Sequence, residues 1–228
     1  MIAIGAARKL ERDANDVFGT SHAFDLAGVH PPSISPSIDW NNFNYPRGLN
    51  LIHYDLDELP SESVKVIRPI HWGFILSCST LLLNLFNTVV LTFGGVSALR
   101  LCFSFLNILI FGPAFGYAFY QGYRGIAVSS SSYTTRFLFC QGCLLVLVLF
   151  FSLVPMGAIN GIARLSHLRA PASSLGISGG IKSYWIYVTV TESLLWLIAL
   201  LIGVRNFYRV WTFNPYESSE DHTGNVFF

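Results

Sequence analysis

Charge is scarce in this chain, and acidic residues are nearly missing from its central part. Charged side chains make up 12% of the 228 residues and hydrophobic ones 52%, whereas an ordinary soluble domain carries roughly 25% charge. Residues 69–209 contain eight Lys/Arg but a single acid, while residues 1–68 contain nine acids and residues 210–228 contain three. This distribution excludes a soluble enzyme. A formal net charge of +1 also excludes a nucleic-acid binder, because it provides no field that neutralises phosphates.

Cysteines and histidines are few, and none is placed as a disulfide or cofactor site requires. The four cysteines, which lie in apolar stretches and act there as small hydrophobic residues, are Cys78, Cys102, Cys140 and Cys143. Cys140 and Cys143 have the spacing of a redox or metal pair, but they lack the further ligands of a closed zinc site. We interpret them as small residues at a helix contact, with reversible palmitoylation as an alternative if Cys140 lies close to the cytosolic interface. We expect no catalytic residue, no metal and no cofactor.

Long apolar stretches occur four times, and each is long enough to cross a bilayer as a helix. Crossing the hydrocarbon core takes about 20 helical residues, and aromatic residues at the edges of the stretches resemble interfacial belts. The predicted fold is an all-α membrane protein, a four-transmembrane-helix bundle with polar N- and C-terminal tails. The predicted membrane domain is 69–209, with spans at about 70–93, 98–120, 136–163 and 184–205.

Two acidic tails flank this domain. The N-terminal tail, residues 1–68, contains a proline-rich linker and a predicted interfacial helix that runs from Asp57 to Pro69, where the chain turns into the membrane. The C-terminal tail covers residues 210–228. No signal peptide is recognisable, because the basic residues near the start are followed by acids. We therefore expect both termini in the cytosol. In this orientation the cytosolic side carries ten Lys/Arg and the opposite side carries four. When only residues within about 20 positions of a span are counted, the numbers are six and four.

Short motifs occur in a fixed order along the chain. They are 39–46 (DWNNFNYP), 54–60 (YDLDELP) and 80–85 (TLLLNL) at the first span, 119–124 (FYQGYR) after the second, and 192–195 (ESLL) with 205–208 (RNFY) at the fourth. In this order they resemble the secretory carrier-associated membrane proteins, the SCAMP family of four-span trafficking proteins. The resemblance covers about residues 39–209.

The resemblance implies a non-enzymatic integral membrane protein of vesicle trafficking, in post-Golgi or endosomal recycling, exocytosis or endocytosis. Such a protein contacts membrane lipids and adaptor proteins, not nucleic acid, in the Golgi, endosomes, secretory vesicles or plasma membrane. The N-terminal Asn-Pro-Phe repeats that recruit adaptors in the family are absent, as in its short members. The nearest candidate tail motif is Asn214, Pro215 and Tyr216.

The aromatic-basic segment between the second and third spans of the family corresponds here to Phe119, Tyr120, Tyr123 and Arg124. The family pattern W-Y-R-P-x-Y has a Trp, a Pro and further basic residues that this chain lacks. By resemblance these four residues form a lipid-contacting interface segment, since aromatic rings beside Arg suit anionic headgroups. Ordinary anchoring in the interfacial belt is the alternative.

Glu192 is the only acid in the predicted membrane domain. A carboxylate at mid-bilayer costs about 2.5–3.5 kcal/mol or more, so its side chain must face other helices. Asn84 of the first span is the expected partner, with Asn107 and Asn160 as further candidates. The structural interpretation is a carboxyl that holds the bundle together by hydrogen bonds. The functional alternative is a proton- or substrate-binding group, which the lack of a second acid or intramembrane histidine disfavours.

Two further functions compete with trafficking. One is a structural accessory subunit of a larger membrane protein complex, in an organellar or other membrane, whose other subunits order the acidic tails. The other is a transporter or membrane enzyme that uses Glu192, but four short-looped helices lack the paired broken helices of transporters.

Overall fold

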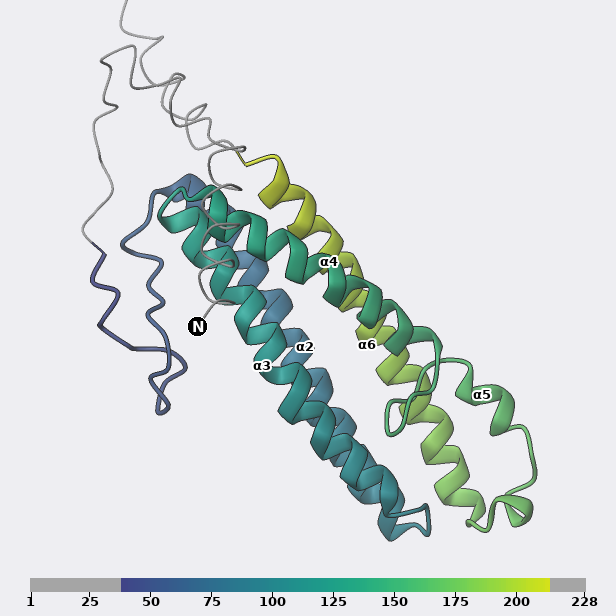
Figure 1. The fold of residues 1–228 in the computed structure, drawn as a ribbon. Coiled ribbons are helices and arrows are strands. Elements are labelled where there is room, and N and C mark those ends of the chain that lie inside the picture. The colour runs from purple at the N-terminus through teal and green to yellow at the C-terminus, as the bar shows by residue number, and fades with distance from the viewer. Residues whose placement is uncertain (1–37, 214–228) are drawn as a thin grey trace, which may run out of the picture. The chain divides into compact units, whose positions relative to one another are not determined.

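The structure is a computed structural model, and it describes residues 38–213. Four long helices form most of this region: α2 (Ser61–Phe93), α3 (Leu99–Ala127), α4 (Ser131–Leu153) and α6 (Gly179–Trp211) (Figure 1). The short helix α5 (Arg164–His167) and the 3-10 turn η3 (Ser173–Leu175) lie between α4 and α6. Each long helix is apolar enough to cross a membrane, and no β-strand occurs within 38–213. The prediction of an all-α, four-span membrane protein is confirmed.

The four long helices pack so that each has two main neighbours. α2 contacts α3 and α6, and α4 contacts the same two helices. In Figure 1 the α2–α3 pair and the α4–α6 pair each run side by side. We call the end of the bundle with residues 94–98 and 154–178 the loop end. At the opposite end, the lead-in end, residues 38–60 (the lead-in segment) precede α2.

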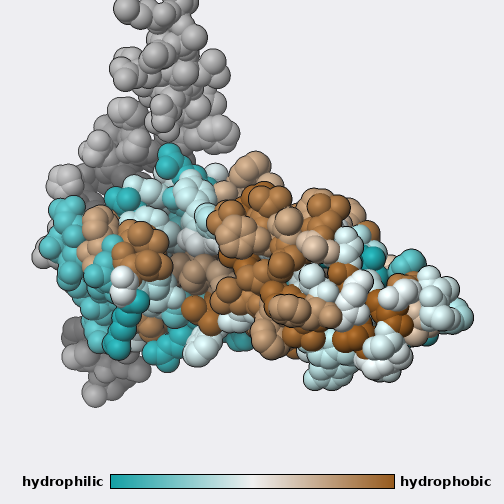
Figure 2. Space-filling view, turned by 90° about the horizontal axis from the view of Figure 1, so that it is seen from below, coloured by the Kyte–Doolittle hydropathy of each residue, from teal (hydrophilic) through white to brown (hydrophobic). Residues whose placement is uncertain are grey.

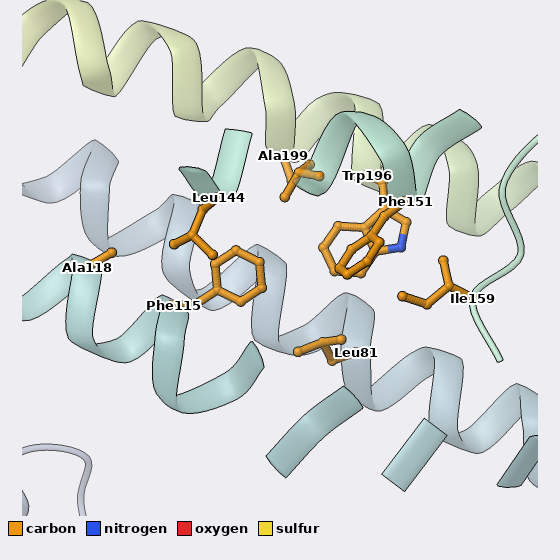
Figure 3. Packing of buried hydrophobic residues seen from close by; sticks show 9 residues of the cluster. Leu81, Phe115, Ala118, Leu144, Phe151, Ile159, Trp196 and Ala199 are labelled. Atoms are coloured by element: carbon orange, nitrogen blue, oxygen red, sulfur yellow. The ribbon is translucent and has the colours of Figure 1, made fainter. Parts of the chain in front are cut away.

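Buried aromatic and aliphatic side chains fill the middle of the bundle. Trp196 of α6 is fully buried, and its ring lies edge-on to Phe151 of α4 at 5.2 Å between centroids and stacks on Phe115 of α3 at 6.3 Å. Leu81 of α2 and Ile159, which follows α4, belong to the same cluster. Figure 3 shows these side chains converging from all four helices. The core therefore ties the four spans directly to one another.

The outer surface of the helices is apolar. Large exposed hydrophobic side chains occur on every long helix, among them Leu82, Phe86, Leu106, Phe139 and Leu201. In Figure 2 hydrophobic residues gather in the middle of the face shown, between more hydrophilic residues at either end. Soluble monomers rarely expose contiguous apolar surface of this kind, whereas a membrane-spanning bundle presents it to lipid.

α2 begins at Ser61 and continues through Pro69 without interruption, which corrects the prediction of a separate interfacial helix that ends there. A proline inside a helix leaves the carbonyl four residues earlier without its N–H partner. That carbonyl belongs to Lys65, and Nη1 of Arg209 donates to it at 3.2 Å. Nδ2 of Asn206 donates to the Pro69 carbonyl at 3.0 Å. Two side chains of α6 therefore supply hydrogen bonds around the proline of α2.

α4 ends at Leu153, ten residues before the predicted end of the third span at 163. Pro155 lacks an N–H and disfavours a helical conformation at Val154, which is extended. At Gly161 an added Cβ would lie 2.4 Å from the Val154 backbone, so only glycine permits this close approach. Residues 154–161, which we call the α4 turn, therefore double back instead of continuing the helix.

Helices α3 and α6 extend past the predicted spans, to Ala127 and from Gly179 to Trp211. The apolar run marks only the part that crosses the hydrocarbon, and a helix can continue into the interfacial layer. The predicted linker of the N-terminal tail and the tail motif of Asn214, Pro215 and Tyr216 lie outside the described residues.

Candidate functional site

Glu192, within α6, is completely buried and accepts hydrogen bonds from three asparagine side chains. Nδ2 of Asn84 and Nδ2 of Asn160 donate to its Oε2 at 2.9 and 3.0 Å. Nδ2 of Asn87 donates to its Oε1 at 2.8 Å. Both carboxylate oxygens therefore face amide donors. We call these four residues the Glu192 cluster.

A second group of side chains orients the three amides. The donors to the amide oxygens are Ser104 (to Asn84, 2.8 Å), Tyr184 (to Asn87, 2.8 Å), and Arg100 and Trp185 (both to Asn160, 2.8 and 3.0 Å). Because each amide oxygen already accepts a hydrogen bond, each amide nitrogen is directed at the carboxylate. The orientation of the cluster is therefore determined by its surroundings.

Local structure explains how the members of the cluster meet. Asn84 and Asn87 are three residues apart on α2 and so lie on the same helix face. Asn160 comes from the α4 turn, and Oγ of Ser193 on α6 donates to its carbonyl at 2.9 Å. Non-helical backbone at membrane depth is tolerated where protein surrounds it, and Asn160 is fully buried. α2 supplies two amide donors to the Glu192 carboxylate, and the α4 turn supplies the third.

Arg100 brings a positive charge near this carboxylate through Asn160. Its Nη2 donates to Oδ1 of Asn160 at 2.8 Å, and Nδ2 of the same asparagine donates to Glu192. Nη2 also donates to the carbonyl of Ala158 in the α4 turn at 3.0 Å. A charge inside a membrane needs such partners. The amide therefore links the acid and the base without a direct ion pair.

The chemistry of the cluster suits holding a carboxylate rather than moving a proton. Three donors converge on its two oxygens. The cluster contains no second acid or histidine through which a proton relay would run. Within residues 38–213 no group of His, Cys, Asp and Glu is arranged to hold a metal ion.

At the lead-in end, the lead-in segment packs on α2 and α3. The hydroxyl of Tyr123 accepts a hydrogen bond from the N–H of Asp55 and donates to its carbonyl, both at 3.2 Å. Trp40 lies edge-on to the Tyr123 ring at 5.9 Å, and the hydroxyl of Tyr45 is 2.8 Å from Nε2 of His71 on α2. The lead-in segment is therefore part of the packed structure.

The lead-in segment also has internal polar contacts. His53 is fully buried, with Nδ1 at 2.9 Å from the Asn42 carbonyl and Nε2 at 3.0 Å from a carboxylate oxygen of Glu58. Burial raises the pKa of Tyr45 and of Tyr54 above the ordinary tyrosine value. Internal hydrogen bonds therefore add to the packing on α2 and α3 in fixing the conformation of the lead-in segment.

A model of the SCAMP family matches residues 42–223. The chain belongs to the SCAMP family. The match runs from the lead-in segment through all four long helices and confirms the resemblance seen in the motifs. No curated protein and no solved structure matches the chain. Family membership and the four apolar helices together identify an integral membrane protein of a trafficking family.

Only part of the counterpart of the SCAMP aromatic-basic segment is exposed at the surface of the protein. Phe119 is 2% exposed and Tyr123 is 0% exposed, and both contact the lead-in segment. Tyr120 and Arg124 are partly buried, and the Arg124 guanidinium lies over the Trp40 ring at 5.1 Å. The expectation that all four side chains contact lipid is therefore corrected for Phe119 and Tyr123, because the lead-in segment covers them.

The sequence of this SCAMP family member predicted that Glu192 would meet an asparagine of another span. The structure brings Glu192, Asn84 and Asn160 together. Asn107 does not join them; its Nδ2 is buried without a partner among the described residues. Sequence reasoning missed Asn87, although its position three residues after Asn84 was a usable signal. It also missed Arg100. The only signal for Arg100 in the sequence was that a basic residue in this region has few acids to pair with.

Cys78 and Cys140 pack beside the hydrophobic core, whereas Cys102 and Cys143 are exposed, so the interpretation as a residue at a helix contact does not hold for Cys143. Cys140 is partly buried beside the core, and Cys143 is exposed on the surface of α4. All four cysteines are free.

Proposed function

We propose that this protein is a non-enzymatic membrane protein of vesicle trafficking, which acts through lipid and protein contacts in Golgi, endosomal, secretory-vesicle or plasma membranes. The observation that carries the proposal is the SCAMP family match over the lead-in segment and all four helices. The interior supports it as well. The two carboxylate oxygens of Glu192 already accept hydrogen bonds from three asparagines of the bundle, which is the pattern of a structural contact rather than of a substrate site.

The proposed orientation places both termini, and with them the lead-in end, in the cytosol. Among the described residues, the basic side chains at the lead-in end are Arg47, Lys65, Arg68, Arg124, Arg136, Arg205 and Arg209. Those at the loop end are Arg100, Arg164, Arg169 and Lys182. The larger number at the lead-in end has the sign that the positive-inside rule requires.

The proposed lipid contact is the hairpin of the lead-in segment rather than the segment that follows the second span. Tyr45 and Ile52 pair as an antiparallel bridge, and the apolar side chains of Phe43, Leu49 and Leu51 around it are 51%, 69% and 65% exposed. The hydrogen bond between Tyr45 and His71 holds this hairpin beside the membrane-entering part of α2. Exposed apolar groups at that level favour burial at the headgroup boundary.

The proposed role of the Glu192 cluster is to lock α2, α6 and the α4 turn in one arrangement. Hydrogen bonds of this kind inside membranes contribute about 0.6 kcal/mol on average and at most about 1.7 kcal/mol each. Three of them on one carboxylate make a substantial share of the stability of a small bundle.

The direct test is to express a C-terminally tagged copy and to measure its colocalisation with Golgi, endosomal and plasma-membrane markers. Protease treatment of sealed vesicles then reports whether both tails are accessible. Colocalisation with recycling compartments and digestion of both tails are expected. A mitochondrial or other non-secretory location would overturn the trafficking role, and protection of either tail would overturn the orientation.

Two further measurements sharpen the proposal. Replacing Leu49 and Leu51 with Ser removes apolar surface outside the core, so the protein should remain folded but shift its distribution between compartments. Blue-native electrophoresis of solubilised membranes should show small species. A large defined complex would favour the alternative role of a structural accessory subunit.

A further inference from the structure

The loop end carries positive charge with little to balance it. Its basic residues are Arg100, Arg164, Arg169 and Lys182. No Asp or Glu occurs in the sequence between Glu62 and Glu192. Glu192 is therefore the only acid near this end among the described residues, and its oxygens already accept three amide hydrogen bonds.

Two of the arginines meet at one indole ring. The guanidinium carbon of Arg100 lies 5.0 Å from the ring centroid of Trp185, and that of Arg164 lies 5.9 Å from it. Both distances are within the range of cation–π contact. Trp185 is itself 6% exposed, and its Nε1 donates to Asn160. The ring is thus held in place by the interior of the bundle and gives the two cations a rigid support.

The two guanidinium groups retain unused hydrogen-bonding capacity. Nε of Arg100 and Nε of Arg164 are both buried without a partner among the described residues. Within 38–213 no carboxylate lies within 4 Å of either side chain. Burial also lowers the pKa of Arg164, which is the effect expected of a cation that has lost water. Both side chains are partly buried, and a cation that has lost part of its water without gaining an anion is costly.

We propose that Arg100 and Arg164, supported by Trp185, form a binding site for a phosphate- or sulfate-type oxyanion at the loop end. A guanidinium presents a planar fork of N–H donors that matches such an anion in two-point contact. Arg100 is already anchored by the Asn160 side chain and the Ala158 carbonyl through Nη2. Arg164 has no such anchor in the described residues, so it is the arginine free to close on the anion.

The same chemistry is available from two sources, a free oxyanion or the headgroup of an anionic lipid. The test uses the whole protein in nanodiscs of zwitterionic phosphatidylcholine and follows its thermal unfolding temperature. Inorganic phosphate or sulfate is titrated at constant ionic strength set with sodium chloride. A parallel series replaces part of the phosphatidylcholine with phosphatidylinositol and contains no added phosphate.

A saturable rise of the unfolding temperature is expected in at least one series. Arg164→Gln should abolish the rise, whereas Arg169→Gln should retain it, because Arg169 is an exposed cation of the same connection that makes no contact with the Trp185 ring. A rise with phosphate assigns the site to a free oxyanion, and a rise with phosphatidylinositol alone assigns it to a headgroup. No rise in either series, or equal behaviour of the two variants, would overturn the proposal.

A charge-preserving variant covers the case in which Arg164→Gln does not fold. Arg164→Lys keeps the cation but loses the planar fork, so half-saturation should need about tenfold more phosphate or lipid. An unchanged half-saturation point in Arg164→Lys would likewise overturn the proposal.

Discussion

Asn160, in the turn that follows α4, donates a hydrogen bond to Glu192 of α6 at 3.0 Å. This contact shows what the early end of α4 makes possible, because the turn that begins at Pro155 carries Asn160 to the carboxylate. If residues 154–163 continued as helix, the Asn160 amide could not reach a carboxylate in the middle of the bundle. The non-helical backbone that results is enclosed by protein, which is the condition for its presence at membrane depth. The break in α4 and the acid in α6 are therefore parts of one arrangement.

Replacement of Glu192 should separate loss of charge from loss of hydrogen bonds. Glu192→Leu removes the acceptor of three amide donors, so thermal stability in detergent should fall by about 0.6–1.7 kcal/mol for each bond lost. Glu192→Gln should behave much like the parent. The new amide nitrogen of the Gln side chain can donate to Oδ1 of Asn87 if the Asn87 amide rotates by half a turn. That rotation is allowed because the Tyr184 hydroxyl, which now donates to Asn87, can also accept from it.

The two outcomes are distinguishable by one comparison. A Gln variant as unstable as the Leu variant would show that the negative charge, not the hydrogen-bonding shape, stabilises the bundle. Stability unchanged in both variants would contradict a structural role for Glu192 altogether.

Truncation of Asn160 should be one of the most damaging asparagine changes. Asn160→Ala removes one donor to Glu192 and leaves the Trp185 indole N–H and one N–H of Arg100 without their acceptor. Stability should fall by about 1–3 kcal/mol, the usual cost of unsatisfied buried polar groups. The matched control is Asn107→Ala, whose amide nitrogen already lacks a partner among the described residues. Equal losses in the two variants, measured by thermal unfolding, would contradict the importance assigned to the α4 turn.

The number and type of the helices could be predicted from sequence, but the end of α4 could not. Four apolar runs of sufficient length leave few alternatives to four spans. Residues 154–163 are also uncharged and contain several apolar side chains, and hydropathy does not distinguish a helix facing lipid from a buried turn. Pro155 and Gly161 were the local signals that the helix stops.

The candidate site could be predicted where it depends on composition and not where it depends on distant contacts. A lone acid in an apolar span must find polar partners on other spans, and Asn84 is one of few available. By contrast, Tyr123 looks the same in sequence whether lipid or protein covers it. Its burial depends on the lead-in segment folding back over it, with Asp55 lying 68 residues away in the chain.

Two tyrosines of the lead-in end should respond differently to loss of the hydroxyl. Tyr123→Phe removes the hydroxyl that both donates to and accepts from Asp55, so stability should fall by about 0.5–1.5 kcal/mol. Cleavage by trypsin at the exposed Arg47 should become faster as the segment loosens. Tyr54→Phe removes a buried hydroxyl that has no partner among the described residues, so it should be neutral or stabilising. Similar losses in both variants would argue against a specific bond to Asp55.

Close packing of α3 on α4 should depend on Gly125. A Cβ at Gly125 would lie 2.8 Å from the backbone nitrogen of Thr134, and backbone cannot move aside as a side-chain end does. Gly125→Ala should therefore cost about 1–3 kcal/mol through overpacking. Gly116→Ala is the control, because its Cβ would make only an ordinary 3.7 Å contact with Phe74 and Ala favours a helix by up to about 1 kcal/mol. An unfolding temperature unchanged by Gly125→Ala would show that the two helices can separate without loss.

The packing of Tyr54 should also make the lead-in end sensitive to alkali. Burial, and then the neighbouring tyrosines Tyr45 and Tyr123, raise the pKa of Tyr54 above its ordinary value of 10.0. Above pH 10 the unfolded segment loses this proton while the folded one retains it, so the unfolded state binds fewer protons and stability falls as pH rises. Below pH 10 both states keep the proton, and the contribution is constant.

The stability difference between Tyr54→Phe and the parent should therefore be flat up to about pH 10 and should then grow in favour of the variant, by at most about 1.36 kcal/mol per pH unit. Urea unfolding of both proteins across this range, followed by tryptophan fluorescence, measures the difference directly. Parallel stability curves above pH 10 would mean that the Tyr54 hydroxyl reaches water in the folded protein.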